Sequence, residues 1–516
     1  MPKVTVNDVE IEVPAGTNMI EAAKLAGVDI PHYCYHPHLS VAGNCRMCMC
    51  ESVGPRGSVL EIACNMQARE GLAIRTDTPN VLAVRKSVME FLLVNHPLDC
   101  PICDQSGECR LQDYYMDHGQ YDSRGNEPKV GKNKRQDIGE HIMLDAERCV
   151  QCSRCERFGD EVTHTGDLRL MNRGDHTEIG MFPGTRLEHD YQGNLADICP
   201  VGALTSKDFR FQRRVWYLRE TESVCTGCAT GCNIKVCHEE GEVFRYLPRR
   251  NDDVNQSWMC DPGRERHTAV GGLSRVLRST VDGKVNAEAI PELAHRIRAA
   301  ATGRVGFVLG SQASMEANWA LLEVVKANCP GARLFAVAGA DAGAIAKSDE
   351  FLMDADKNPN TAGVALLVER AGNVEDAEAL RIADLDLLVV LEDDIVSRLG
   401  APLSVPIAYF GRESNPTADV AVVLIPVAHP AEMDATYVNR QGRVQRARRA
   451  TTPLGDAVPA YVALDRLGAA LGKAPNTSMP VATFLAIVKA IPRMAGLDYR
   501  GIAGTGKLIA PPAEAK

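Results

Sequence analysis

One imidazole and three thiols lie close together in the segment HPLDCPICDQSGEC, residues 96–109. The spacing is His-x3-Cys-x2-Cys-x5-Cys, and the side chains belong to His96, Cys100, Cys103 and Cys109. Soft thiolates grouped in this way bind zinc or an iron–sulfur cluster, and histidine can replace a cysteine in either kind of site. Because three thiols need a fourth ligand, we expect His96 to complete the site. This segment alone leaves zinc and iron–sulfur open.

A second cysteine group carries a more specific signal. Cys149, Cys152 and Cys155 follow one another at two-residue gaps, and Cys199 comes later, directly before Pro200. The pattern C-x2-C-x2-C completed by Cys-Pro is the [4Fe–4S] signature of bacterial ferredoxins. In two-cluster ferredoxins the Cys-Pro cysteine serves the other cluster, but this sequence has no second group of that type. We therefore expect Cys199 to complete the same site.

The N-terminal group consists of Cys34, Cys45, Cys48 and the more distant Cys64. Plant-type [2Fe–2S] ferredoxins use C-x4-C-x2-C with a distant fourth cysteine. Here the first gap is longer, which resembles the ferredoxin-like domain of respiratory NADH dehydrogenases. The resemblance implies that these four cysteines hold a [2Fe–2S] cluster. Cys50 is an alternative to Cys48, although only Cys48 fits the x2 spacing.

A fourth group consists of Cys225, Cys228, Cys232 and the later Cys260. The order C-x2-C-x3-C followed by a distant cysteine resembles the N-terminal [4Fe–4S] module of molybdopterin oxidoreductases. A zinc ribbon is the alternative interpretation of this group. Three cysteines remain outside the four groups, and we expect no ligand role for them: Cys50, Cys237 and Cys329.

Sequence periodicity predicts the elements that position these groups. Residues 1–13 alternate apolar and polar around an Asn7-Asp8 turn, which predicts a β-hairpin with one buried face formed by Val4, Val6, Val9, Ile11 and Val13. A helix is expected over residues 18–26 and ends at Gly27. Another helix begins at Thr78-Pro79 and delivers His96 to the cysteine loop. Its apolar positions are Val81, Leu82, Val84, Val88, Phe91 and Leu92.

From about residue 270 the chain is rich in Ala, Val and Gly and almost free of cysteine. Short apolar runs alternate with helical stretches, which predicts a parallel α/β domain. Residues 310–325 and 434–450 resemble the body of molybdopterin oxidoreductases. The tail GIAGTGKL, residues 501–508, imitates a phosphate loop, but Leu508 stands where Ser or Thr should hold magnesium, so we reject a nucleotide site there.

Length and composition exclude several classes of protein. A chain of 516 residues is too long for a single compact core. A formal net charge of −10 without a basic block argues against nucleic-acid binding. The sequence has 18 cysteines, no segment typical of a signal peptide and no apolar run long enough to span a bilayer. Metal binding therefore explains the cysteines better than disulfides do.

The order of the four groups resembles that of the large iron–sulfur subunit family (the G subunit) of NADH–quinone oxidoreductase, respiratory complex I. The resemblance is strong over roughly the first 265 residues and loose beyond them. It implies a multidomain α+β and α/β protein with a β-grasp ferredoxin-like domain, helical and loop iron–sulfur domains and a degenerate molybdopterin-oxidoreductase-like α/β domain. The expected boundaries are 1–78 for the [2Fe–2S] domain, 79–119 for the histidine-ligated domain, 120–217 for the ferredoxin-type domain, 218–274 for the molybdopterin-type domain and 275–516 for the α/β domain.

The resemblance implies one [2Fe–2S] cluster and three [4Fe–4S] clusters, one of them with a histidine ligand, and no catalytic residue in this chain. The histidine site is expected to be the second station in a line of clusters. Electrons would come from an NADH- and FMN-binding flavoprotein and its [2Fe–2S] partner and leave through a ferredoxin-like two-cluster subunit and quinone-module subunits. The implied location is the cytoplasmic side of the bacterial inner membrane, held by partners without a span of its own.

Other families share parts of this pattern. A formate dehydrogenase large subunit needs a cysteine or selenocysteine on molybdenum, and only Cys329 is available in the α/β region. An [FeFe] hydrogenase needs further cysteine-rich segments, which the C-terminal half of this chain lacks. The diaphorase-type subunit of a NAD-linked hydrogenase is closer but usually ends before the α/β region. A structural zinc protein is disfavoured because four different spacings are an unusual way to build zinc sites.

Overall fold

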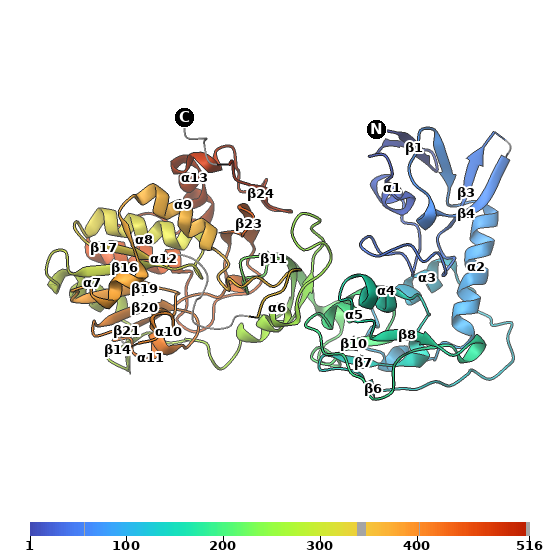
Figure 1. The fold of residues 1–516 in the computed structure, drawn as a ribbon, viewed down its shortest axis with the longest axis horizontal. Coiled ribbons are helices and arrows are strands. Elements are labelled where there is room, and N and C mark those ends of the chain that lie inside the picture. Colours follow the sequence, from blue (N-terminus) through green and yellow to red (C-terminus); the bar gives the residue numbers. More distant parts are fainter. Residues whose placement is uncertain (56, 338–346, 402, 512–516) are drawn as a thin grey trace. The chain divides into compact units, whose positions relative to one another are not determined.

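The computed structural model describes residues 1–55, 57–337, 347–401 and 403–511. The chain forms two compact units, Met1–Tyr217 and Leu218–Lys516, which are described separately (Figure 1). Two of the predicted domains, 1–78 and 275–516, include residues that lie outside these described ranges. No helix within those ranges has both the length and the hydropathy needed to cross a membrane.

The first unit begins with a five-stranded sheet in the order β2-β1-β5-β3-β4. β1 runs parallel to β5, and the other neighbours are antiparallel. Helix α1 (Met19–Leu25) begins at Asn18, whose side chain accepts a hydrogen bond from the amide of Ile20. This arrangement fits the predicted ferredoxin-like fold. The strands are β1 (Lys3–Val6), β2 (Val9–Glu12), β3 (Met49–Gly54), β4 (Gly57–Ile62) and β5 (Leu72–Arg75).

The predicted hairpin forms, but its second strand does not bury the expected face. Val4 and Val6 are fully buried, whereas Val9 is 44% exposed. The reason is position, because β2 is an edge strand that pairs only with β1. Alternation in the sequence therefore predicted the strands correctly and the burial of Val9 wrongly.

Helix α2 (Pro79–Val94) begins at Thr78 and has Asn95 as its C-cap, immediately before His96, as predicted. Its buried residues are Val81, Arg85 and Met89, so the predicted apolar face is only partly correct. Phe91 is 80% exposed, and Leu82 is also exposed. A short helix, α3 (Arg110–His118), follows the cysteine loop and packs on α2.

The rest of the first unit consists of short elements around the ferredoxin-type cysteines. Helix α4 (Arg154–Glu161) contains Cys155, and α5 (Gly193–Ile198) ends directly before Cys199. The strands form one sheet of order β10-β7-β6 and one pair, β8-β9. They are β6 (Gln136–Asp137), β7 (Ile142–Leu144), β8 (Leu168–Met171), β9 (Glu178–Met181) and β10 (Leu204–Ser206).

The second unit starts with a three-stranded antiparallel sheet next to the fourth cysteine group. Its strands are β11 (Arg219–Val224), β12 (Asn233–Glu239) and β13 (Glu242–Pro248), and helix α6 (Asp261–Glu265) follows Cys260.

An α/β domain fills the remainder of the second unit, as the alternation of apolar runs and helices predicted. Its strands lie in the order β15-β14-β21-β20-β19-β16-β17-β18. The six strands from β16 to β21 are parallel, and the order reverses between β16 and β19, which makes the sheet doubly wound. β16, β19 and β20 are buried at every position because helices cover both faces.

The strands of this domain are β14 (Thr280–Val281), β15 (Lys284–Val285), β16 (Val305–Leu309), β17 (Arg333–Ala336), β18 (Val374–Asp376), β19 (Leu387–Leu391), β20 (Ile407–Gly411) and β21 (Val423–Pro426). A separate sheet contains β22 (Ala435–Val438), β23 (Arg443–Ala447) and β24 (Lys507–Leu508). The helices are α7 (Ala289–Ala299), α8 (Met315–Asn328), α9 (Thr361–Ala371), α10 (Ile395–Leu399), α11 (Pro416–Asp419), α12 (Ala460–Leu471) and α13 (Pro480–Ala490).

Candidate metal centres

The four N-terminal cysteines form one contact group. Cys34 lies in the loop after α1, Cys45 and Cys48 precede β3, and Cys64 lies in a 3-10 turn after β4. The thiol of Cys34 is hydrogen-bonded to those of Cys45 and Cys64, and Cys48 is hydrogen-bonded to Cys64. These bonds lower the pKa of Cys34 and Cys48, whereas they raise the pKa of Cys45 and Cys64. The fold thus brings together the four cysteines predicted for the [2Fe–2S] site.

Cys50 is buried in the same core but has other partners. Its thiol lies 3.7 Å from the carbonyl oxygen of Glu61 and 3.8 Å from the sulfur of Met66. Burial raises the pKa of Cys50 to about 12, so it is a neutral thiol at ordinary pH. Within the described residues, the geometry therefore favours Cys48 over Cys50 as the fourth member of the group.

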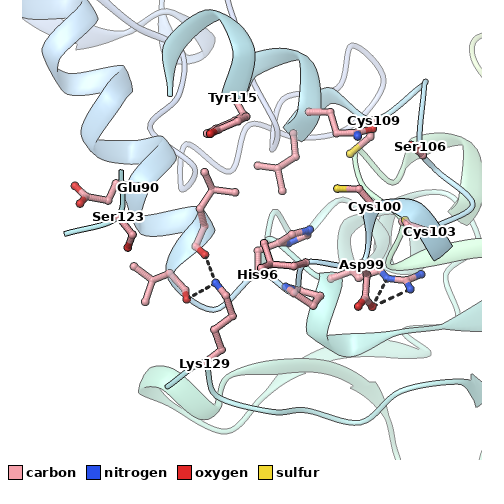
Figure 2. Close-up of a pocket in the computed structure, with 18 of the residues that line it drawn as sticks. Glu90, His96, Asp99, Cys100, Cys103, Ser106, Cys109, Tyr115, Ser123 and Lys129 are labelled. Atoms are coloured by element: carbon pink, nitrogen blue, oxygen red, sulfur yellow. Dashed lines mark hydrogen bonds and ion pairs between the residues drawn. The ribbon is translucent and has the colours of Figure 1, made fainter. Parts of the chain in front are cut away.

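His96 and its three cysteines border a cavity of about 330 Å³ in the first unit. Figure 2 shows the sulfurs of Cys100 and Cys109 directed toward the space that the ring of His96 also borders. Burial lowers the pKa of His96 to about 4, and the nearby cations Lys129 and Arg148 contribute to this shift. The imidazole is therefore neutral at ordinary pH, which is the form that binds a metal.

The surroundings pack closely around this loop. A Cβ atom placed on Gly202 would lie 2.3 Å from the sulfur of Cys103, so only glycine fits there. The guanidinium of Arg214 donates to the carbonyl oxygens of Cys103 and Pro101, each at 2.6 Å, and holds the loop from outside. Figure 2 shows Lys129 at the end of α2, where its ammonium donates to the last two carbonyls of the helix.

The ferredoxin-type cysteines also converge. Cys149, Cys152, Cys155 and Cys199 line one small cavity together with Pro200. Burial raises the pKa of Cys149 to about 12 and that of Cys199 to about 11, and the neighbouring thiols contribute. Without a cation these thiols stay neutral, because buried thiolates are costly, and a bound iron cluster would supply the positive charge that lets them ionise.

The fourth group lies in the second unit, between the turn after β11 and the start of α6. Burial raises the pKa of Cys232 well above its usual range. The neighbouring thiols add to this effect, and they belong to Cys225, Cys228 and Cys260. A Cβ atom on Gly263 would lie 3.1 Å from the sulfur of Cys260 and 3.3 Å from that of Cys225. The backbone thus approaches the sulfurs closely, as it does at Gly202.

Three of the four groups share one hydrophobic cluster in the first unit. Cys34, Cys109 and Cys152 are buried members of it, and Cys45, Cys149 and Cys199 pack against it. The sulfur of Cys109 lies 4.0 Å from the carbonyl oxygen of Pro200, the residue after Cys199. The ferredoxin-type group therefore contacts both the N-terminal group and the histidine group. This arrangement differs from the expectation that the histidine site is the second in line.

The pattern of cysteines did not reveal a set of buried arginines beside the thiols. Arg85 donates to the carbonyl oxygen of Met49, next to Cys48, and Arg148 lies close enough to Cys103 for the thiol to raise the pKa of the guanidinium. Arg154 is buried on α4 beside the ferredoxin-type cysteines, and the half-buried Arg157 lies on the same helix. The only signal in the sequence is adjacency, since Arg148 precedes Cys149 and Arg154 precedes Cys155.

Within the described residues, no group of three or more His, Cys, Asp or Glu side chains is arranged to hold a single metal ion. A cluster differs from a single ion because it distributes its ligands over several iron atoms, so its thiols need not converge on one point.

Four family models match the region that contains these groups. They are the 2Fe-2S iron-sulfur cluster binding domain over residues 2–79, the NADH-ubiquinone oxidoreductase-G iron-sulfur binding region over 85–124, the NADH-quinone oxidoreductase subunit 3 ferredoxin-like domain over 139–205, and the NADH-ubiquinone oxidoreductase NDSU1/NuoG-like 4Fe-4S domain over 218–267. Each matched range contains one complete predicted ligand set.

Relatives of known name match the same region. The mitochondrial NADH dehydrogenase [ubiquinone] iron-sulfur protein 1 of Solanum tuberosum is 45% identical over 265 residues, which are 51% of this chain and 35% of that protein. The G subunit of the NADH-quinone oxidoreductase of Rickettsia bellii is 39% identical over 327 residues, 62% of this chain and 47% of that protein. Over this region the chain is similar to the large iron–sulfur subunits of NADH–quinone oxidoreductases.

The chain spans less than half the length of these two relatives. A chain in a solved structure, an NAD+-reducing [NiFe]-hydrogenase in the H2-reduced state, is 28% identical, and the match covers 42% of this chain and 91% of that one. Its TM-score is 0.37, which is too low to support a shared architecture. The similarity to the large iron–sulfur subunits therefore depends on the sequence matches.

Proposed function

We propose that this chain is an electron-relay subunit of NADH–quinone oxidoreductase. It holds one [2Fe–2S] cluster on Cys34, Cys45, Cys48 and Cys64 and three [4Fe–4S] clusters on the other groups, with His96 as a ligand of one. When bound, such clusters supply one-electron transfer, and the protein contributes spacing, burial and the tuning of potentials. The observation that supports the proposal is the shared hydrophobic cluster, to which three of the four cysteine groups contribute.

The contacts indicate an order of transfer that differs from the order along the chain. Arg157 donates one hydrogen bond to the carbonyl oxygen of Cys34 and another to that of Cys152, which links the N-terminal and ferredoxin-type groups. Cys109 and Pro200 link the ferredoxin-type and histidine groups. Electrons would therefore pass from the [2Fe–2S] site through the ferredoxin-type site to the histidine site.

The proposed partners are those that the resemblance to this family implies. We infer that a flavoprotein oxidises NADH and, with its [2Fe–2S] partner, supplies single electrons to this chain. A ferredoxin-like two-cluster subunit and the quinone-module subunits receive them, with no nucleic acid and no catalytic residue of this chain involved. The complex would hold the chain at the cytoplasmic side of the bacterial inner membrane.

The α/β domain fits a degenerate relative of the molybdopterin oxidoreductases better than a catalytic one. A cavity of about 410 Å³ lies beyond the carboxyl ends of β19 and β20, where doubly wound sheets bind ligands. Charged side chains that line it are paired with one another, as in the buried ion pair of Arg412 with Glu392. Cys329 is the C-cap of α8 and does not line this cavity. We therefore propose no molybdenum chemistry for this chain.

Metal analysis tests the proposed relay directly. The full chain, purified without oxygen, should contain about 14 iron atoms if all four sites carry the proposed clusters. Dithionite-reduced protein should give EPR signals of both [2Fe–2S] and [4Fe–4S] types. Stoichiometric zinc without EPR signals would instead identify structural zinc sites and end the proposal.

Replacing the histidine tests its role as a ligand. In His96→Cys an anionic thiolate takes the place of a neutral imidazole, which disfavours the more negative reduced state. Iron content should stay constant, and the midpoint potential of one [4Fe–4S] signal should fall by about 59 mV or more, a tenfold change in a one-electron equilibrium. His118→Gln, on α3 and outside the cavity lining, is the matched control. An unchanged potential in His96→Cys would contradict the ligand role.

A further inference from the structure

One face of α4 holds the loop that carries Cys34. The guanidinium of Arg154 donates to the carbonyl oxygen of Tyr35, and that of Arg157 donates to the carbonyl oxygen of Cys34 at 2.6 Å. Glu161 accepts a hydrogen bond from the amide of Ser40 at 2.8 Å. The three side chains are spaced at i, i+3 and i+7, so they share one face of the helix. The same helix contains Cys155, a proposed ligand of the ferredoxin-type site.

Arg154 differs from Arg157 and Glu161 because, within the described residues, it is a buried cation without a carboxylate partner. Its residue is only 7% exposed. Within the described residues its guanidinium bonds only to carbonyl oxygens, those of Tyr35 and of Ile198 at 3.0 Å, and its Nε atom has no partner. A buried charge is costly unless an opposite charge compensates it.

The opposite charge that this site offers is the ferredoxin-type group. Burial lowers the pKa of Arg154, and the cations Arg110 and Arg157 add to this effect, whereas the groups of Cys152 and Cys199 favour the charged guanidinium. Ile198, which accepts a hydrogen bond from Arg154, directly precedes Cys199. The guanidinium is therefore fixed beside one ligand group and reaches the loop of another.

We infer that Arg154 is the counter-charge of the ferredoxin-type cluster and raises its reduction potential. This inference depends on the proposed function, since it requires a cluster on Cys149, Cys152, Cys155 and Cys199. A cluster gains one negative charge when it accepts an electron, and a fixed cation in a medium of low dielectric constant stabilises that added charge. Arg154 thus makes the site an acceptor for an electron that arrives from the [2Fe–2S] site. Arg154 is a positioning residue and takes no part in bond making.

The test compares charge removal with charge retention. The variants are Arg154→Met, which removes the charge, and Arg154→Lys, which keeps it, and Arg169→Met on the protein surface is the control. Each full-length chain is titrated with dithionite, and the ferredoxin-type signal is followed by EPR. In Arg154→Met the ratio of reduced to oxidised cluster at a fixed potential should fall at least about tenfold, equivalent to 59 mV. Arg154→Lys should stay within about threefold of the unmodified chain.

Each other outcome has a defined meaning. If Arg154→Met loses about four iron atoms but Arg154→Lys keeps them at the native potential, the cluster needs the charge and the inference stands. If Arg154→Lys loses the cluster or shifts as far as Arg154→Met, the hydrogen bonds matter and the charge does not, so the inference falls. An unchanged potential in Arg154→Met also overturns it. If the unmodified chain lacks the [4Fe–4S] signal, the proposed function itself has failed.

Discussion

Changing Cys152 to serine should remove one [4Fe–4S] cluster and interrupt electron flow between two others. The chain should contain about four fewer iron atoms. Because the ferredoxin-type group contacts both neighbouring groups, its loss leaves no intermediate station between them. On the proposed relay, the NADH:quinone reductase activity of the assembled complex should fall by about 100-fold or more, because loss of a ligand should cost at least as much as loss of an outer-shell partner.

Cys237→Ser is the matched control for this variant. Cys237 is also a buried cysteine, but it lies on β12 outside the four ligand groups. Its replacement should leave iron content and reductase activity close to those of the unmodified complex. Full iron content and an undiminished rate in Cys152→Ser would contradict both the ligand assignment and the proposed order of transfer.

Serine replacements should have opposite effects on the [2Fe–2S] signal at Cys48 and Cys50, which are only two positions apart. Cys48→Ser should abolish the [2Fe–2S] EPR signal, because Cys48 belongs to the hydrogen-bonded group of four thiols. Cys50→Ser should keep that signal, because the Cys50 thiol faces the carbonyl oxygen of Glu61 and the sulfur of Met66. EPR of the dithionite-reduced full chain at matched iron content measures both. The reverse result, with the signal lost only in Cys50→Ser, would make Cys50 the ligand.

Spacing along the sequence predicted which cysteines come together, since each predicted group is close in the structure. It could not predict which groups touch. The contact between Cys109 and Pro200 joins residues far apart in the chain, and no local pattern encodes it. Chain order therefore suggested a line in which the histidine group comes second, whereas the ferredoxin-type group lies in contact with both others.

Burial on individual elements was also only partly predictable. Apolar periodicity located α2, but Phe91 is exposed although it fits the pattern, because burial depends on what packs against each face. Arg85 is buried in the same helix and bonds the backbone beside Cys48. Charged residues are predicted at the surface by default, so the arginines beside the thiols could be recognised only from the structure.

The shared core of the first unit has a consequence for how the protein is made in the cell. Proposed ligand cysteines from separate stretches of sequence, among them Cys34, Cys109 and Cys152, are packed inside one apolar cluster. A scaffold protein that delivers iron and sulfide cannot reach those thiols once the cluster has closed around them. Folding of Met1–Tyr217 should therefore be coupled to the delivery of iron and sulfide. The newly made chain should remain partly unfolded until the clusters have been inserted.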